Sequence, residues 1–273
     1  MPPVLPDPPL TATGPPVPVP PLVPGQPPIA LLVDYDGTVS QTDVTDTLMA
    51  EFVDADWEAH VAEYDAGLVG SRRLMAWEVA LITADPLVLS AVAASQPHDA
   101  GFRPFAELAR AARIPVEIVS DGFGFFIEPA LEALGVGWIP VVTADTRFGP
   151  TGPTIEFPNG DSRCFVCGTC KRNRVIAHQA AGRRVVFIGD GESDRYAAGY
   201  ADVVFAKRSL EVFCLARGWP FERWTNFKEI RRWLGRELDA FAADPRSLPG
   251  PSPRPFFCGA EAWGEGRIDP PAG

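Results

Sequence analysis

The chain has 273 residues, enough for one large domain or two small ones. Hydrophobic residues make up 46% of it and charged residues 22%, as in an ordinary globular protein. With 24 basic against 35 acidic residues, its formal net charge of −11 excludes the basic surface that a nucleic-acid backbone requires. No apolar run reaches the ~18 residues that span a bilayer, so we expect neither a nucleic-acid nor a membrane partner.

Proline is distributed unevenly along the chain. Of the 30 prolines, 13 lie in residues 1–28 and 7 in residues 245–273. We therefore expect a disordered proline-rich arm at 1–28, a proline-rich tail at 245–273 and a folded unit between them. The arm has no Lys or Arg and does not resemble a secretory signal, although it could dock to a proline-reading partner. Because five cysteines do not suggest a disulfide framework, we expect a cytoplasmic protein.

Taken in chain order, the elements alternate between strands and helices. Short continuous apolar runs, typical of strands buried on both faces of a parallel sheet, lie at 29–33, 115–120, 184–189 and 202–205. Helical patterns follow at 102–113, 123–134, 172–181, 193–200 and 226–238. This order predicts an α/β fold, namely a Rossmann-like, doubly wound and mainly parallel sheet.

The segment 43–113 interrupts the alternation. Apart from its last helix it contains helical patterns such as 68–82 and 86–94 and no convincing strand. We expect an all-helical cap domain at 43–113, inserted after the first strand of a core that comprises 29–42 and 114–244. The cap has 12 acidic residues against five arginines, so it holds −7 of the total charge of −11.

Three of the predicted strands end in an acidic or hydroxyl residue close to a glycine. These ends are Asp34-Tyr35-Asp36-Gly37-Thr38, Ser120-Asp121-Gly122 and Asp190-Gly191, with Asp194 one helical turn further on. The carboxyl ends of parallel strands form the usual ligand site of an open α/β sheet. Carboxylates gathered there repel one another unless a cation lies among them, and oxygen ligands completed by water and phosphate favour Mg²⁺.

The same residues resemble the four motifs of the haloacid dehalogenase (HAD) superfamily. The stretch 34–38 resembles the first motif, DxDGT, and 189–194 the fourth, GDxxxD, while Ser120 and Lys171 fit the second and third. The resemblance covers about 29–237. A helical cap between the first and second motifs is similar to the phosphoserine phosphatase-like branch, subfamily IB.

The resemblance implies a Mg²⁺-dependent phosphatase that hydrolyses a small-metabolite phosphomonoester through an aspartyl-phosphate. Asp34 would be the nucleophile, and Asp36 would protonate the leaving alkoxide and then activate water. That role requires the pKa of Asp36 to be raised relative to Asp34. Lys171 would neutralise negative charge on Asp34 and on the transferring group.

The resemblance also implies the binding groups. Ser120 and the Gly122 amide would hold phosphate oxygens. Mg²⁺ would lie between Asp34, the backbone carbonyl of Asp36 and Asp190, with Asp194 bound directly or through water.

Two further features resemble the 2-hydroxy-3-keto-5-methylthiopentenyl-1-phosphate phosphatases of methionine salvage and their relatives. One is a run of three cysteines, Cys164, Cys167 and Cys170, directly before Lys171. The other is the ending 205–231. The cysteines admit three interpretations: a structural Zn²⁺ site completed by Cys214, Asp161 or Cys258, a redox pair, or small apolar residues in a tight loop.

Substrate choice is expected to lie in the cap. Asp43 stands where phosphoserine phosphatases have a Glu that contacts the substrate amine. Trp57, Met75 and Trp77 fit either an apolar pocket or ordinary helix packing. The alternatives to a methylthiopentenyl phosphate are therefore phosphoserine, phosphocholine and phosphoethanolamine. Transfer of phosphate to an alcohol and a non-hydrolytic binding or regulatory protein on the same scaffold also remain open.

Overall fold

The computed structural model describes residues 16–53, 56–150, 152–161, 164 and 166–252. Its centre is a sheet whose described strands run in the order β4-β3-β2-β1-β5-β6-β7. β1 (Ile29–Val33) lies between β2 (Val116–Phe123) and β5 (Arg184–Gly189) and is parallel to both, with Leu31 opposite Val116 on one side and Val186 on the other. This arrangement explains why β1 is apolar throughout, since both of its edges and both of its faces are covered.

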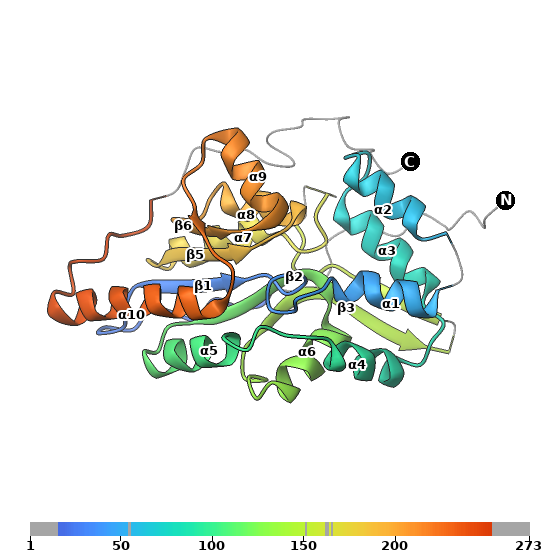
Figure 1. Ribbon diagram of the computed structural model, residues 1–273, viewed down its shortest axis with the longest axis horizontal. Helices are drawn as coiled ribbons and strands as arrows, with labels where there is room; N and C mark the ends of the chain where they lie inside the picture. Colours follow the sequence, from blue (N-terminus) through green and yellow to red (C-terminus); the bar gives the residue numbers. More distant parts are fainter. Residues whose placement is uncertain (1–15, 54–55, 151, 162–163, 165, 253–273) are drawn as a thin grey trace.

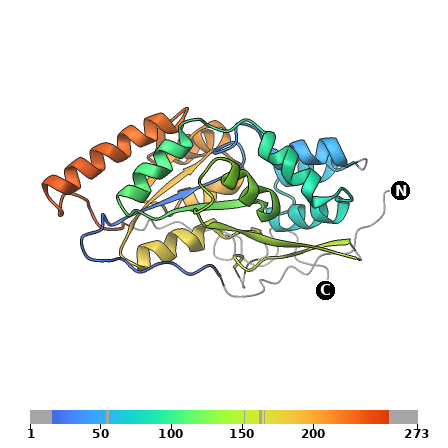
Figure 2. The ribbon, with the colours of Figure 1, turned by 90° about the horizontal axis from the view of Figure 1, so that it is seen from below.

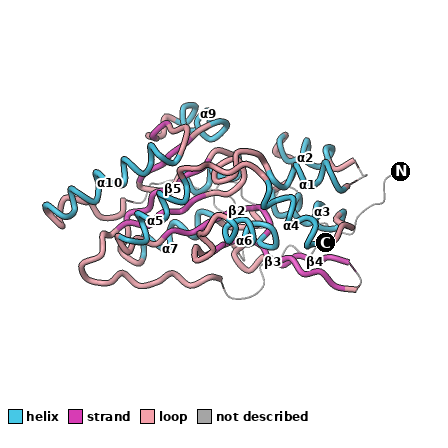
Figure 3. The backbone as a smooth tube through the Cα atoms, turned by 60° about the horizontal axis from the view of Figure 1, so that its bottom comes forward, coloured by secondary structure: helices cyan, strands magenta, loops and turns pink. Residues whose placement is uncertain are grey.

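The sheet continues on both sides of these three strands. β6 (Val203–Ala206) and β7 (Glu222–Arg223) extend it beyond β5 in parallel. On the other side, β3 (Val141–Gly149) is parallel to β2, and β4 (Gly152–Glu156) returns antiparallel to β3. Figure 3 shows β3 and β4 projecting from the sheet as a hairpin. The expected doubly wound, mainly parallel sheet is confirmed.

Helices cover both faces of the sheet (Figure 1). On one face lie α5 (Phe102–Ala111), α6 (Gly124–Ala133) and α10 (Phe227–Ala243), and on the other α7 (Lys171–Ala180), α8 (Arg195–Ala198) and α9 (Arg208–Arg217). Successive β1 residues divide between the two hydrophobic clusters. Leu31 packs in the cluster of Phe105 and Phe227, whereas Leu32 packs in the cluster of Val175 and Leu210. Alternation along a strand thus gives the protein two cores.

The helices that follow β1 do not all lie together. α1 (Val44–Phe52), α2 (Glu58–Asp65) and α3 (Ser71–Leu81) stand beside the carboxyl ends of the strands (Figure 1). By contrast, α4 (Pro86–Ser95) packs on α6, and α5 packs on α10. The expected cap, 43–113, therefore includes two helices whose main packing partners belong to the core. Within the described residues no single helix has the length and apolar composition to cross a bilayer, and α3 with α4 reaches it only across a 119° bend.

The proline-rich arm differs from the expected disordered segment where the structure describes it. Residues 16–28 run along α7 (Figure 2). Val17 N donates to Asn159 Oδ1 at 3.1 Å, Arg174 donates to the carbonyls of Val17 and Pro18, and Arg183 Nη1 donates to Pro20 O at 2.7 Å. Proline removes backbone donors but keeps the carbonyl acceptors, which these arginines use. Residues 1–15 and 253–273 lie outside the described part.

Candidate active site

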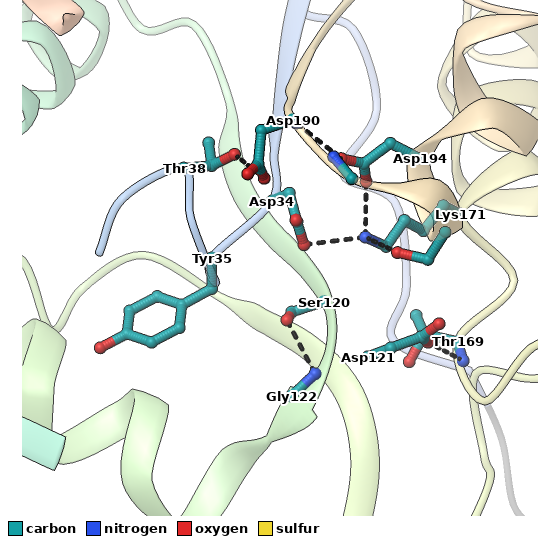
Figure 4. A network of polar contacts seen from close by, with 12 residues as sticks. Asp34, Tyr35, Thr38, Ser120, Asp121, Gly122, Thr169, Lys171, Asp190 and Asp194 are labelled. Atoms are coloured by element: carbon teal, nitrogen blue, oxygen red, sulfur yellow. Dashed lines mark hydrogen bonds and ion pairs between the residues drawn. The ribbon is translucent and has the colours of Figure 1, made fainter. Parts of the chain in front are cut away.

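Three buried carboxylates meet at the carboxyl edge of the sheet (Figure 4). Asp34 follows β1, Asp190 follows β5, and Asp194 ends the short 3₁₀ helix η1 (Glu192–Asp194). One carboxylate oxygen from each lies within 4.8 Å of the other two, and the residues are at most 6% exposed. The neighbouring parallel strands β1 and β5 both end at this point, which brings residues 156 positions apart in the sequence into contact.

Lys171, the first residue of α7, lies among these carboxylates. Its Nζ donates to Asp194 Oδ1 at 2.6 Å, Asp34 Oδ1 at 2.8 Å and Ser193 Oγ at 3.0 Å, and the side chain is buried. Burial opposes its charge, but Asp194 and Asp34 outweigh burial and raise the pKa of Lys171 well above its ordinary value. The lysine is therefore a fixed positive charge directed at Asp34.

The lysine does not neutralise the cluster. Burial, followed by repulsion from Asp194, raises the pKa of Asp34 well above its ordinary value, although Lys171 lowers it in part. The same two causes raise the pKa of Asp190 to about 6. Burial and then Asp43 raise the pKa of Asp36 well above its ordinary value, although the backbone N–H of Val44 lowers it in part. A cluster of oxygen donors with this excess of negative charge fits a hard divalent cation.

Asp190 and Asp194 are held by different partners. Asp190 accepts from Thr38 Oγ1 at 2.9 Å and from Arg208 Nη1 at 3.0 Å. Asp194 Oδ2 accepts from the backbone N–H groups of Asp190 and Gly191 at 2.9 and 3.0 Å, while its Oδ1 takes the lysine. Both oxygens of Asp194 are thus engaged by the chain itself, which suits it to orienting Lys171 and the turn after β5.

Ser120, Gly122 and Asp36 lie on the other side of Asp34. Ser120 Oγ accepts from Gly122 N at 2.9 Å, and Asp36 Oδ1 accepts from Val44 N at 2.8 Å, where α1 begins. A Cβ on residue 122 would stand 2.6 Å from Asp36 Oδ2, so any larger residue would require the Asp36 carboxylate to shift. Asp121, next to Ser120, accepts instead from Thr169 N at 2.7 Å and ties the end of β2 to the loop before Lys171.

A cavity of about 310 Å³ extends from these residues toward α1, α2 and α3. Asp43 lines it, as expected for a residue that contacts substrate, and also caps α1 by accepting from Asp46 N at 2.9 Å. Met75 lines the cavity too, whereas Trp57 packs against the main core and the ring of Trp77 contacts that of His60 in a tilted arrangement. Of the three candidate pocket residues, only Met75 faces the site.

The cysteine run forms the loop between β4 and α7. Arg72 of α3 donates from Nε to Cys167 O at 2.9 Å, and Arg72 N donates to Val166 O at 3.0 Å, so this loop is joined to the cap helix. Among the described residues, Asp34, Asp190 and Asp194 are the only group of metal-ligand type gathered closely enough to hold an ion.

The zinc prediction for Cys164, Cys167 and Cys170 therefore has no support. Two of the fourth ligands considered are unsuitable. Asp161 is engaged by Arg172 Nη2 at 3.1 Å and Asn173 Nδ2 at 2.9 Å. Cys214 belongs to α9 and is buried in the hydrophobic cluster of Val175 and Leu210. Cys258 lies outside the described residues.

Sequence reasoning missed several residues of the site. Thr38 and Arg208 hold Asp190, and Ser193 accepts from Lys171. Glu78 lines the cavity from α3. The sequence did contain a signal for Glu78, because Ser71, Met75 and Glu78 share one face of the predicted helix. A carboxylate on a buried helix face is unfavourable unless a polar or charged group binds it.

The fold and the site together define a hydrolase of the HAD class, and comparison with known proteins agrees. A family model described as haloacid dehalogenase-like hydrolase matches residues 31–199, and the chain belongs to this family. It is similar to proteins named 2-hydroxy-3-keto-5-methylthiopentenyl-1-phosphate phosphatase. The one from Brevibacillus brevis is 25% identical over 76% of this chain and 95% of the relative, and the one from Lysinibacillus sphaericus is 30% identical over 67% and 84%.

Solved structures support the same fold. A phosphoserine phosphatase described as a phospho-aspartyl intermediate analogue is similar with a TM-score of 0.59 and 16% identity, over 76% of this chain and 99% of that one. Together the comparisons support a phosphatase, and they confirm the expected family.

Proposed function

We propose that this protein is a Mg²⁺-dependent phosphatase that hydrolyses the phosphomonoester of a small metabolite through a phosphorylated Asp34. The observation that carries the proposal is the juxtaposition of a buried Asp34 with Lys171 Nζ at 2.8 Å and with Asp190 within reach of a shared cation. A relative of the same fold is described with a phospho-aspartyl analogue, which supports this chemistry.

In the first half-reaction, Asp34 attacks phosphorus, the bond from phosphorus to the ester oxygen breaks, and Asp36 gives its proton to the leaving alkoxide. The raised pKa of Asp36 suits it to carry that proton. The alcohol then leaves. In the second, Asp36 takes a proton from water, which attacks the aspartyl-phosphate, so that the bond from Asp34 to phosphorus breaks, inorganic phosphate leaves and Asp34 is restored.

The remaining groups act by charge and position. Lys171 offsets charge on Asp34 and on the transferring phosphoryl oxygens, and Asp194 orients Lys171. Asp34, Asp190 and the Asp36 carbonyl would hold Mg²⁺, with Asp194 beside them. The ion would supply positive charge to the phosphate oxygens. Ser120 and the Gly122 amide would bind the phosphate, the amide leaving its bond to Ser120 Oγ when substrate arrives.

The substrate is a separate question. The names of the relatives support 2-hydroxy-3-keto-5-methylthiopentenyl-1-phosphate as the first candidate. The acidic residues that line the cavity favour a second group of candidates with an amine or quaternary ammonium group, namely phosphoserine, phosphocholine and phosphoethanolamine. We further propose that α1 to α3 act as the cap over the site, and that the protein works in the cytoplasm.

The test is hydrolysis of an aryl phosphate by an Asp34→Asn variant in the presence of Mg²⁺. We expect a loss of at least about 10³-fold in kcat with an unchanged melting temperature. Asp56→Asn, at an exposed position between α1 and α2, is the matched control and should retain full activity. Acid quenching of the wild type should trap one phosphoryl group per chain.

Retained turnover in Asp34→Asn would overturn the mechanism. A wild type that binds phosphomonoesters without hydrolysing them would point to the regulatory alternative. Phosphorylated alcohols formed in the presence of competing alcohols would identify a transferase.

A further inference from the structure

The charged side chains that line the cavity beside Asp34 are almost all acidic. Its described lining includes nine carboxylate side chains and one cationic side chain, Arg208. On the core side the cationic side chains are already engaged in ion pairs. Lys171 pairs with Asp34 and Asp194, and Arg208 pairs with Asp190. A phosphate group adds further negative charge there, which a bound divalent cation would offset. On the cap side, the described lining adds no further cationic side chain.

The cap carboxylates are Asp43, Asp46, Asp65 and Glu78. Asp43 uses one oxygen as the cap of α1, and Asp65 is exposed to water. Repulsion from Asp43 and Asp65 adds to burial in raising the pKa of Asp46 to about 7. An acidic surface alone would not define a site, since solvent can stabilise exposed carboxylates. Glu78 differs because it is not exposed.

Glu78 is only 5% exposed, and it faces the cavity from α3 beside Leu74 and Met75. Within the described residues it makes no hydrogen bond and no ion pair. Its surroundings all disfavour its charge: burial and then Asp43, Asp46 and Asp121 raise its pKa well above the ordinary value, and no cation lowers it. A buried carboxyl without a hydrogen-bond or ion-pair partner lowers the free energy of unfolding.

A second oxygen in the same cavity is also unpartnered. Asp121 Oδ1 accepts from Thr169 N, but Asp121 Oδ2 is buried and has no hydrogen-bond partner. Tyr64 of α2 and Met75 of α3 also line this part of the cavity. An aromatic face and a thioether beside carboxylates suit an alkylammonium group, which combines positive charge with an apolar surface.

We propose that the alcohol released by this phosphatase carries an ammonium group, and that Glu78 binds this group across the cavity. The substrate class is therefore a phosphomonoester of a small amino alcohol, with the phosphate at Asp34 and the cation at α3. The inference rests on the proposed phosphatase activity for its placement of the phosphate. It goes further by assigning Glu78 as the residue that selects the leaving group.

The alternative to a cationic leaving group bound by ionised Glu78 is a neutral leaving group that accepts a hydrogen bond from protonated Glu78. Glu78→Gln separates the two, because glutamine keeps the shape and a hydrogen-bond donor but cannot carry the negative charge. The probes are phosphoethanolamine with its uncharged analogue 2-hydroxyethyl phosphate, and phosphocholine with its uncharged isostere 3,3-dimethylbutyl phosphate. The methylthiopentenyl phosphate is included as the neutral candidate.

We expect the wild type to prefer each cationic probe to its uncharged partner at least about tenfold in kcat/KM, and this preference to be lost in Glu78→Gln, with a kcat/KM ratio near one. Glu63→Gln, at an exposed position on α2, is the control and should keep the wild-type preference. Because the substitution removes a buried carboxyl that has no partner and keeps its shape, the melting temperature should not fall, which serves as the folding check.

Equal kcat/KM values for charged and uncharged probes in the wild type would overturn the inference. So would a preference for the charged probes that survives in Glu78→Gln. A higher kcat/KM of the wild type for the methylthiopentenyl phosphate than for the charged probes would also overturn it. If no phosphomonoester is hydrolysed, the proposed function fails instead. Calorimetric binding of the same probe pairs in the presence of Mg²⁺ then decides the role of Glu78 by itself.

Discussion

Lys171 Nζ lies 2.6 Å from Asp194 Oδ1, closer than the 2.8 Å that separates it from Asp34 Oδ1. The lysine is therefore held by a carboxylate from the turn after β5 and presented to a carboxylate at the end of β1. Because Asp194 is itself fixed by two backbone N–H groups, this charge is placed before any substrate arrives.

Replacing Lys171 by methionine should lower kcat for an aryl phosphate by about 10²–10³-fold, since the positive charge next to Asp34 is lost. The melting temperature of the metal-free protein should also fall, because Asp34 and Asp194 remain buried without their partner. Steady-state kinetics and thermal unfolding measure the two effects. Lys228→Met, at an exposed position on α10, should change neither, and an active Lys171→Met enzyme would exclude the role given to the lysine.

The pKa of about 6 at Asp190 predicts a pH-dependent stability. The native state binds this proton more tightly than the unfolded chain does, so the free energy of unfolding should rise as pH falls from about 6 toward 4. In EDTA at pH 7, Asp190→Asn should raise the melting temperature by several degrees relative to wild type, a difference that shrinks at pH 4.5.

Thermal unfolding at both pH values, with and without Mg²⁺, measures whether Asp190→Asn raises or lowers the melting temperature. Added Mg²⁺ should stabilise the wild type at pH 7 more than it stabilises Asp190→Asn. A variant less stable than wild type in EDTA at pH 7 would contradict the prediction.

The purified protein should contain less than about a tenth of an equivalent of zinc after extensive dialysis, since the described cysteines do not assemble a tetrahedral site. Elemental analysis of the full chain makes this measurement. It also includes Cys258, which lies outside the described residues. One equivalent of zinc that is lost in Cys164→Ser would restore the metal interpretation.

Removal of residues 1–28 should lower the melting temperature by on the order of 5 °C, because Arg174 and Arg183 lose the carbonyls of Val17, Pro18 and Pro20 as acceptors. Removal of residues 1–15 alone should have little effect, which is the control. The kcat of both truncated proteins should match wild type. Equal stability of all three proteins would show that the segment 16–28 adds nothing to the fold.

Sequence patterns located the central strands because burial on both faces produces continuous apolar runs. Residues 29–33 and 184–189 were predicted as strands and form β1 and β5. β3 and β4 were missed because Thr143, Asp145 and Arg147 put polar groups along a strand that becomes exposed as it leaves the sheet. Helix α5 was placed in the cap because its order after the first strand does not reveal that it packs on α10.

The site was predictable where it consists of short local motifs. Asp34, Lys171, Asp190 and Asp194 meet at the sheet edge, as the strand order implied. Arg208 was not predicted as a site residue because only the folded chain brings α9 to this cavity. Glu78 shares a helix face with Ser71 and Met75, but that pattern does not show which cavity the face lines. Tertiary contacts of this kind leave no periodic signal in the sequence.

The attachment of α3 to the cysteine loop determines how the cavity can open. Arg72 bonds to the backbone of Val166 and Cys167, and Ser71 Oγ accepts from Gly168 N at 3.2 Å. These hydrogen bonds hold α3 in place. An outward movement of α3 would also displace the loop that leads to Lys171. α2, in contrast, has no fully buried residue. We expect substrate to enter past α2. In that case α3, which carries Glu78, stays in place while α2, on the opposite side of the cavity, moves.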